Sequence, residues 1–389
     1  MNFENKIYKI LLTGGGTGGS VAPLLAVAEE LKIPLTPFPP ERTRSVRAGV
    51  KGGKVEFEFF WLGTKFGPER EMVQRAGIKF RAISGGKWRR YFSLKNLVDI
   101  FKIKLGFWQA FLIMLNWRPN LVMSAGSFSS VPVVWAAWLL GVPVLIHQQD
   151  ITAGLANKLM APFAKVITAT FEKSLADYGK KAVWTGNPTR KELRITNYEL
   201  RIKIQEGLPV VLIVGGGTGA VPINNLVEES LEELTKFCQI IHVTGKNKSI
   251  TNYKLQITNY VKYEFLDSEK MADALNAAAL VVTRSGLGIL SELSYLGKPS
   301  IIIPIPNSHQ EANAEFFRQQ KAAVVAQQKY LTPENFTKMV KNVLADEKMR
   351  GQLAINMRNA MKQGANQEMV EIIYKILNFK GNGFPPARE

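Results

Sequence analysis

Residues that cross-link chains or hold metal ions are scarce in this sequence. Its 389 residues include one cysteine and three histidines. The lone cysteine, Cys238, falls in a helix-like run, excludes a disulfide within the chain and has no group of His, Asp or Glu around it. We therefore expect a reducing, cytosolic environment and no metal site.

Long apolar runs are missing as well. The two longest, residues 106–117 and 131–146, are too short to cross a bilayer, and prolines and a glycine interrupt the second. The first residues lack the basic, apolar and small-residue order of a signal peptide. The sequence therefore predicts a chain that does not cross a membrane.

Negative charge is the third shortage. Lys and Arg total 50 and Asp and Glu total 32, so the net charge is +18. Such an excess predicts an anionic partner, and nucleic acid, a phospholipid surface and phosphorylated substrates all have the required sign.

The stretch with the most features is residues 282–313. Its pattern predicts a strand, a Ser-Gly turn, a helix, a Gly-Pro break, a second strand and a second helix, which is a βαβ unit. A helix that begins after such a turn offers unpaired N–H groups to an anion. Glu292 can accept hydrogen bonds from a ribose, and Gln310 and Asn313 share a helix face that can bind a sugar. The stretch predicts a nucleotide-sugar site, and the alternative is ordinary capping and solvated polar residues.

Two glycine-rich turns, residues 13–20 and 215–220, each join a predicted strand to a predicted helix. Without side chains the backbone can close on a phosphate. An NAD-binding fold uses the same device, but no clear acidic residue closes a second strand about 20 positions after the first turn. At this length two domains are the default, and the repeat predicts two Rossmann-like halves joined near residues 185–190, where Gly and Pro break the periodicity.

Residues 84–117 combine cations with aromatic and apolar side chains. Such a basic amphipathic helix lies in an anionic membrane interface. The alternatives are a helix packed on a sheet and a surface that stacks nucleic-acid bases, although no nucleic-acid motif accompanies it. The residues are Lys87, Arg89, Arg90, Lys95, Lys102 and Lys104, with Trp88, Tyr91, Phe92, Leu94, Leu97, Phe101, Phe107, Trp108 and Phe111.

Several short segments are predicted to be surface insertions. The proline-containing, basic run 33–54 is one of them. The others are the Ile-Thr-Asn-Tyr copies near residues 195, 250 and 257 and the Phe-Pro-Pro segments near 38 and 384.

Six segments, in this order along the chain, resemble glycosyltransferase family 28, which has the GT-B fold. They are Gly15-Gly16-Thr17-Gly18-Gly19, Ile146-His147-Gln148-Gln149-Asp150, Thr185-Gly186-Asn187-Pro188-Thr189-Arg190, Gly215-Gly216-Gly217-Thr218-Gly219-Ala220, Arg284-Ser285-Gly286 to Glu292, and His309-Gln310 to Asn313-Ala314. The resemblance implies an α/β chain with two Rossmann-like, doubly wound domains that face each other across a cleft. They would be residues 1–186, which bind acceptor and membrane, and 187–365, which bind UDP-GlcNAc. Residues 366–389 would form a helix that packs back toward the first domain, plus a tail.

The resemblance also implies a reaction and its partners. The peptidoglycan branch of the family transfers GlcNAc from UDP-GlcNAc to lipid I, undecaprenyl-diphosphoryl-MurNAc-pentapeptide, and makes lipid II. We expect the same inverting transfer here, without a cofactor and without nucleic acid. The protein would sit on the cytoplasmic face of the cell membrane, with residues 87–111 against anionic lipid.

Site residues follow from the resemblance position by position. Those placed at the acceptor diphosphate and the reacting sugars are Thr17, Gly18, Gly19 and Ser20. Those placed on the donor are Arg190, Gly217 and Thr218 at the phosphates, Leu266 at the uracil edge, Ser285, Gly286 and Leu287 at the start of the anion-binding helix, Glu292 at the ribose, and Gln310 with Asn313 at GlcNAc.

The chain departs from the family pattern around the reacting centre. Ser20 stands where the family usually has His, and Phe128 where it has Tyr. The usual His-Glu-Gln-Asn segment has Gln148 and Asp150 in place of Glu and Asn, and Gly217 replaces a serine in the second glycine turn.

Inversion requires a base, because the acceptor hydroxyl attacks opposite the departing UDP and must lose its proton. Ser20 is a poor base, so Asp150 and His147, at the end of a strand that faces the cleft, are the candidates. The alternative is that Asp150 only hydrogen-bonds the sugar and His147 is buried and satisfied. Backbone N–H groups, a helix dipole and Arg190 can stabilise the leaving UDP without a metal, and no Asp-x-Asp triplet occurs in the chain.

Other functions remain compatible with these features. A related glycolipid synthase would use diacylglycerol as the acceptor. A noncatalytic nucleotide-sugar or lipid-diphosphate binding protein would explain Ser20, and a dinucleotide-dependent oxidoreductase would use the glycine turns.

Overall fold

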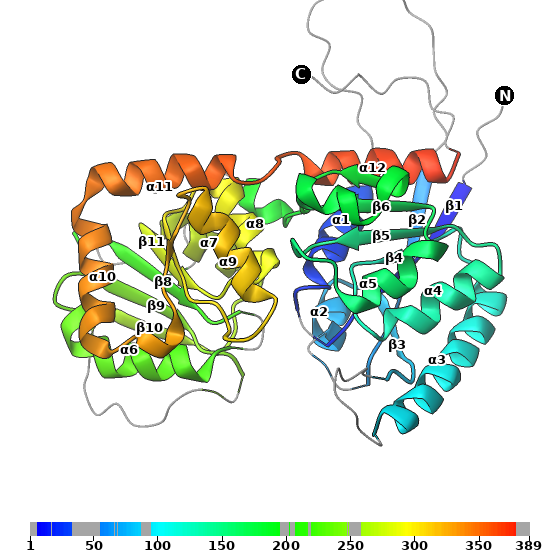
Figure 1. The fold of residues 1–389 in the computed structure, drawn as a ribbon, viewed down its shortest axis with the longest axis horizontal. Helices are drawn as coiled ribbons and strands as arrows, with labels where there is room; N and C mark the ends of the chain where they lie inside the picture. Colours follow the sequence, from blue (N-terminus) through cyan, green and yellow to red (C-terminus); the bar gives the residue numbers. More distant parts are fainter. Residues whose placement is uncertain are drawn as a thin grey trace, which may run out of the picture.

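The computed structural model describes residues 6–16, 18–32, 55–65, 67, 69–86, 95–194, 202, 207–216, 219–246, 248 and 258–378. These residues form two parallel β-sheets with helices packed on them, side by side along the long axis (Figure 1). Within the described residues, no helix combines the length and apolar character needed to span a membrane.

The first half contains a seven-stranded sheet in the order β3-β2-β1-β4-β5-β6-β7, with parallel pairing throughout. Its strands are β1 Lys6–Thr13, β2 Val55–Gly63, β3 Lys79–Ala82, β4 Leu121–Ser124, β5 Val144–Gln148, β6 Val166–Ala169 and β7 Ala182–Trp184. Its α-helices are α1 Ala22–Lys32, α2 Glu69–Arg75, α3 Lys95–Trp117, α4 Ser130–Leu139 and α5 Leu155–Met160. Short 3₁₀ turns occupy Ala161–Phe163, Glu172–Asp177, Gly179–Lys181 and Lys191–Arg194.

The second half repeats this plan with a six-stranded sheet in the order β10-β9-β8-β11-β12-β13. Its strands are β8 Val210–Val214, β9 Gln239–Val243, β10 Tyr260–Tyr263, β11 Leu280–Thr283, β12 Ser300–Ile302 and β13 Val324–Val325. Its α-helices are α6 Val221–Leu234, α7 Ser268–Ala277, α8 Leu287–Leu296, α9 Gln310–Gln319, α10 Pro333–Ala345 and α11 Glu347–Asn359, with a 3₁₀ turn at Gln328–Tyr330.

Each sheet is buried on both faces, which is why a central strand such as β8 is apolar at every position. In β8, Val210, Leu212 and Val214 belong to one hydrophobic cluster, and Val211 and Ile213 belong to the cluster on the opposite face. This is the pattern of a doubly wound α/β fold. In both sheets the strand order reverses next to the first strand of the half, β1 or β8. Doubly wound folds bind ligands at this point of reversal, and each glycine turn follows directly after β1 or β8 there. The prediction of two Rossmann-like halves is confirmed.

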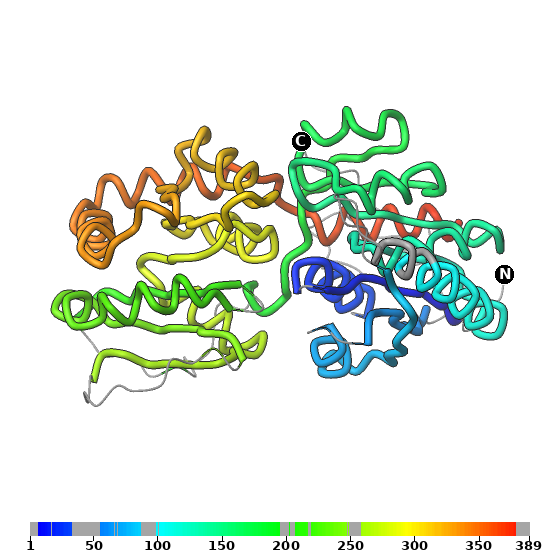
Figure 2. The backbone as a smooth tube through the Cα atoms, turned by 60° about the horizontal axis from the view of Figure 1, so that its bottom comes forward, coloured from blue at the N-terminus to red at the C-terminus, as the bar shows by residue number. Residues whose placement is uncertain are grey.

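The chain returns to the first half through α12, Ala365–Ile376 (Figure 2). Met369, Ile373 and Tyr374 of this helix belong to the same hydrophobic cluster as Leu24 and Val27 of α1. The segment that returns to the first half, around Asn366, lies against the segment that leaves it, around Thr189. The side chain of Asn366 accepts a hydrogen bond from Thr189 N and donates one to Thr189 O, both at 3.0 Å.

Gly186 shows how closely the two connecting segments approach each other. Its φ is +79°, and a Cβ atom there would lie 2.4 Å from Lys362 O. Any other residue would clash with the returning segment and would also strain the backbone. The Gly in the connecting segment is therefore required by geometry.

Two local predictions need correction. Cys238 is not in a helix, because α6 ends at Leu234 and Cys238 lies in the turn before β9. It is fully buried, and burial raises the pKa of its thiol to about 12. The third Ile-Thr-Asn-Tyr copy is partly a structural element, since Asn259 donates to two turn carbonyls and Tyr260 begins β10. The other predicted insertions lie outside the described residues.

Candidate functional site

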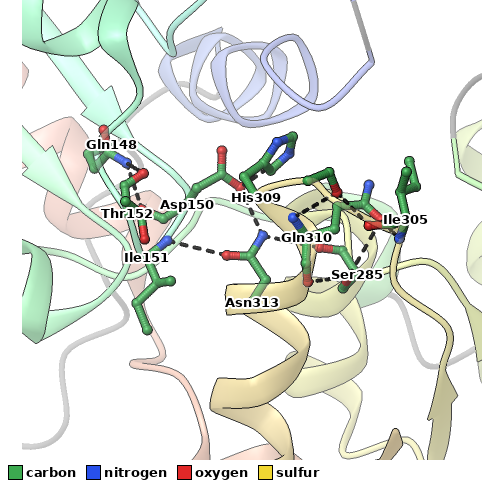
Figure 3. Close-up of polar contacts among 10 residues, drawn as sticks. Gln148, Asp150, Ile151, Thr152, Ser285, Ile305, His309, Gln310 and Asn313 are labelled. Carbon is green, nitrogen blue, oxygen red and sulfur yellow. Dashed lines mark hydrogen bonds and ion pairs between the residues drawn. The ribbon is translucent and has the colours of Figure 1, made fainter. Parts of the chain in front are cut away.

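The turn between β11 and α8 brings together several of the predicted donor residues. Ser285 Oγ donates to Gln310 O at 2.7 Å, and Gln310 Oε1 accepts from Ile305 N at 3.3 Å (Figure 3). Gly286 caps α8 in an extended conformation and supplies no side-chain acceptor. The first N–H groups of α8, which begins at Leu287, therefore have no side-chain cap and can bind an anion.

Asn313 of α9 joins the two halves at this turn. Its Nδ2 donates to Asp150 Oδ1 at 2.9 Å and to Ser285 O at 3.2 Å, and its Oδ1 accepts from Ile151 N at 3.3 Å (Figure 3). Asn313 is fully buried, whereas the Asp150 side chain is 37% exposed, with His309 Nε2 at 4.0 Å. The carboxylate of Asp150 thus lies at the junction of the halves and is accessible to solvent.

Gln148 holds the loop that carries Asp150. Its Nε2 donates to Asp150 O at 2.6 Å and Thr152 O at 3.3 Å, while its Oε1 accepts from Asn157 at 2.6 Å and from the Tyr178 hydroxyl at 2.8 Å. An ionised glutamate, the usual family residue, could not donate to the two carbonyls. Gln148, unlike a glutamate, can therefore donate the two hydrogen bonds that hold this loop.

His147 is placed differently from Asp150. It is fully buried, its Nδ1 lies 2.9 Å from Thr168 Oγ1, and its Nε2 lies 2.8 Å from Asn187 Oδ1. Asn187 in turn donates to Ser291 Oγ in α8 at 2.7 Å. Both ring nitrogens have hydrogen-bond partners away from solvent, and through Nε2 His147 orients Asn187. His147 thus has the buried, hydrogen-bonded environment of the alternative interpretation, whereas Asp150 is accessible to solvent.

Two buried imidazoles predict a loss of stability in acid. Burial lowers the pKa of His147 and of His242 to about 4. Their unfolded pKa is about 6.5, so the stability they contribute is fully present above that pH and is lost as the pH falls toward 4. We expect the free energy of unfolding to drop between pH 7 and pH 5 by on the order of 2 kcal/mol for each histidine. Urea unfolding at the two pH values measures this drop, and His242→Gln should remove about half of it. An unchanged difference in that variant would contradict the assignment.

Arg190 and Glu292, predicted to hold the donor phosphates and the ribose, form an ion pair. Arg190 Nε lies 2.6 Å from Glu292 Oε1, and the side chains are 25% and 5% exposed. Burial raises the pKa of Glu292, and the Arg190 guanidinium opposes that rise. Two residues 102 positions apart in the sequence are thus brought together at the middle of α8 by the fold.

The first glycine turn is held by hydrogen bonds of its own backbone and by the carboxylate of Glu69, which accepts from Gly16 N. Gly18 O accepts from the N–H groups that begin the helix, while Gly19 is half-buried. Ser20 is buried and donates to Gly15 O at 3.4 Å, so its hydroxyl serves the turn. Thr17, Gly217 and Thr218 lie outside the described residues.

Leu266 has its side chain in the core of the second half, 3% exposed. Any role in reading a uracil edge would therefore fall to its backbone, as the family resemblance implies. Among the described residues, no group of three or more His, Cys, Asp or Glu side chains could hold a metal ion.

Glu69 is a site residue that sequence reasoning missed. It is fully buried at the start of α2, and it accepts from Gly16 N at 3.3 Å and from Thr64 N at 3.0 Å. A Cβ atom on Gly15 would come within 2.6 Å of it. An acidic residue in the first turn of a helix after a strand was a usable signal, although nothing in the sequence identified its partners.

Comparisons with known proteins place both halves in one family. Residues 45–169 match the glycosyltransferase family 28 N-terminal domain, and residues 210–372 match the C-terminal domain of the same family. A relative from Clostridium kluyveri, named UDP-N-acetylglucosamine--N-acetylmuramyl-(pentapeptide) pyrophosphoryl-undecaprenol N-acetylglucosamine transferase, is 37% identical over 377 residues. The match covers 94% of this chain and 99% of the relative. A relative of the same name from Lachnospira eligens is 35% identical and covers 94% of this chain and 98% of the relative.

Solved structures have the same fold. The crystal structure of MurG from Acinetobacter baumannii superposes with a TM-score of 0.65 at 25% identity, over 95% of this chain and 99% of that one. The UDP-GlcNAc 2-epimerase of Neisseria meningitidis, bound to UDP-GlcNAc, gives a TM-score of 0.66 at 16% identity over 94% of this chain and 100% of that one, and shows the fold alone.

Proposed function

The chain belongs to glycosyltransferase family 28, and from this premise we propose that it transfers GlcNAc from UDP-GlcNAc to lipid I, with inversion, to make lipid II for peptidoglycan synthesis. The observation that carries the proposal is the match, over 94% of the chain, to relatives named for this transfer. The polar groups described at the junction of the two halves support the proposal.

The second half binds the donor. The uncapped N–H groups at the start of α8 face the diphosphate, and Arg190 adds a fixed positive charge beside them. Glu292, held by Arg190, accepts from the ribose hydroxyls. Gln310 orients GlcNAc, and the fully buried Asn313 acts behind it by holding Asp150 through its side-chain amide. These groups are in place before the reaction, so they stabilise the charge that develops on the departing UDP.

Asp150 takes the proton. The acceptor hydroxyl attacks C1 of GlcNAc from the face opposite UDP, the bond from C1 to the UDP oxygen breaks, and the proton passes to the Asp150 carboxylate. The support for this role is its position at the junction of the halves, 2.9 Å from Asn313 and accessible to solvent.

Purified protein, labelled UDP-GlcNAc and a lipid I analogue test the proposed function. We expect labelled lipid II with and without EDTA, because the leaving group is stabilised by N–H groups and Arg190. A parallel reaction with diacylglycerol should give no product. Transfer to diacylglycerol alone, or no transfer to lipid I, would overturn the proposal.

We also propose that α3 docks the enzyme on the membrane that carries its acceptor. One face of the helix exposes five apolar side chains at alternating spacings of four and three residues, and the other face packs, through Ala110 and Met114, into a hydrophobic cluster shared with α4 and the sheet. The helix lies on the side of the first half away from the second half (Figure 1). The exposed residues are Phe101, Leu105, Trp108, Leu112 and Leu115, with exposures from 47% to 71%.

Removing part of this face should weaken membrane binding. The triple variant Phe101→Ser/Trp108→Ser/Leu112→Ser should lower partitioning onto vesicles that contain anionic lipid by about 100-fold, at about 1 kcal/mol for each partly inserted side chain. Vesicle sedimentation measures the change. Tyr330→Ser/Ile355→Ser, at similarly exposed positions in the second half, should bind like the wild type. Equal binding by the triple variant would refute the docking surface.

A further inference from the structure

The short helix α2 contacts both halves of the molecule. Its first residue, Glu69, accepts from Gly16 N in the first glycine turn, so this end of the helix fixes the acceptor side of the site. Thr64, at the end of β2, donates its backbone N–H to the same carboxylate at 3.0 Å. Because Glu69 is fully buried, this end of α2 cannot shift without moving the turn.

The outer face of α2 contacts the second half. Glu71 Oε2 accepts from Lys246 Nζ, and Glu71 Oε1 lies 2.6 Å from Arg75 Nη2. The Arg75 guanidinium lies over the Phe265 ring, 4.7 Å from its centroid. Phe265 directly precedes Leu266, and Lys246 lies in the loop after β9. We call these four residues, Glu71, Arg75, Lys246 and Phe265, the α2 bridge.

The loop on the far side of the α2 bridge packs on the second glycine turn. Lys248 Nζ donates to Gly219 O at 3.2 Å. Gly219 has φ +72°, and a Cβ atom there would lie 2.0 Å from Thr244 O, so the turn and the loop are in direct contact. A continuous series of contacts therefore runs from the first glycine turn, through α2, to the second.

We propose that α2 is a positioning element that sets the donor-binding half against the acceptor-binding turn. The proposal rests on the proposed function, because it assigns the two turns to the two substrates. Glu71 and Lys246 are 46% and 55% exposed, and such pairs contribute little to overall stability. A weak, exposed contact between halves suits a junction that must open for substrates and close for transfer.

Charge reversal tests the α2 bridge. Glu71→Lys places a third cation beside Lys246 and Arg75, and Lys246→Glu places two carboxylates together. We expect each to lower kcat/KM for UDP-GlcNAc by about 3- to 10-fold, mainly through KM, at low salt. The exchange Glu71→Lys/Lys246→Glu restores an opposite-charge pair and should return to within about twofold of the wild type. High salt should reduce the differences.

The matched control is an exposed pair inside one half. Glu233 near the end of α6 and Lys236 in the turn after it are 62% and 59% exposed, and Glu233→Lys should leave kcat/KM unchanged. All variants should keep the wild-type Tm. If the substitutions acted only by destabilising the fold, the Tm of the single variants would be lower and the exchange variant would not regain the wild-type kcat/KM.

The outcomes separate the two proposals. Wild-type protein that makes no lipid II contradicts the proposed function, and the dissociation constant for UDP in the same variants still tests the α2 bridge. Single reversals that match the wild type, or an exchange variant no better than the singles, would overturn the role of α2.

Discussion

Replacing Asp150 by asparagine should lower kcat by about 10²- to 10⁴-fold, the range contributed by a general base. The substitution changes little else. The new side-chain amide still presents an oxygen to Asn313 Nδ2, and Gln148 still holds the carbonyl of residue 150, so the junction of the halves is retained. Steady-state transfer to a lipid I analogue gives kcat, and calorimetry with UDP should show donor binding close to that of the wild type.

Ser20→Ala is the comparison for this variant. The Ser20 hydroxyl is buried and bonded within its own turn, so its loss should change kcat by no more than a few-fold. A kcat for Asp150→Asn within a few-fold of the wild type would remove Asp150 from the mechanism and leave it as a sugar-binding residue.

Breaking the buried pair between Arg190 and Glu292 is expected to have the second large effect. Arg190→Met leaves the 5%-exposed carboxylate of Glu292 without its cation, which should lower the free energy of unfolding by about 3–5 kcal/mol. The Tm should fall by roughly 10 °C. The pKa of Glu292, already raised by burial, should rise further because the opposing charge is gone. Affinity for UDP-GlcNAc should fall by about 100-fold, since a charge beside the phosphates is lost.

A double variant separates stability from binding. Arg190→Met/Glu292→Gln has no buried charge at this position, so most of the lost stability should return. Donor affinity should stay low, because neither the cation nor the ribose-binding carboxylate is restored. Thermal unfolding and UDP-GlcNAc titration on the same samples distinguish the two effects, and a wild-type Tm for Arg190→Met would mean that the pair is not structural.

The fold was predictable because its signals are local. Uninterrupted apolar strands such as residues 210–214, each followed by a glycine turn and a helix, identify parallel strands buried on both faces. The repetition of that unit indicated two halves. Helix ends were harder to predict, since Cys238 was expected in a helix-like run but α6 ends at Leu234 and Cys238 lies between it and β9.

The site was only partly predictable, because its geometry depends on partners far apart in the sequence. The position of His147 at a strand end suggested a base, but its environment is set by Thr168 and Asn187, which no local pattern connects to it. The role of Gln148 was unpredictable for the same reason, since its four hydrogen-bond partners come from three segments of the chain. A pattern of residue types indicates which groups exist, whereas burial decides which of them can meet a substrate.

The return of α12 to the first half has a consequence for biogenesis. Met369, Ile373 and Tyr374 complete a hydrophobic cluster whose members outside α12 come from residues 10–145 of the first half. During translation the ribosome must therefore release α12 before the opening strands and α1 can bury this face, even though the second half is contiguous and can fold earlier. The half that is synthesised first is the half that is finished last.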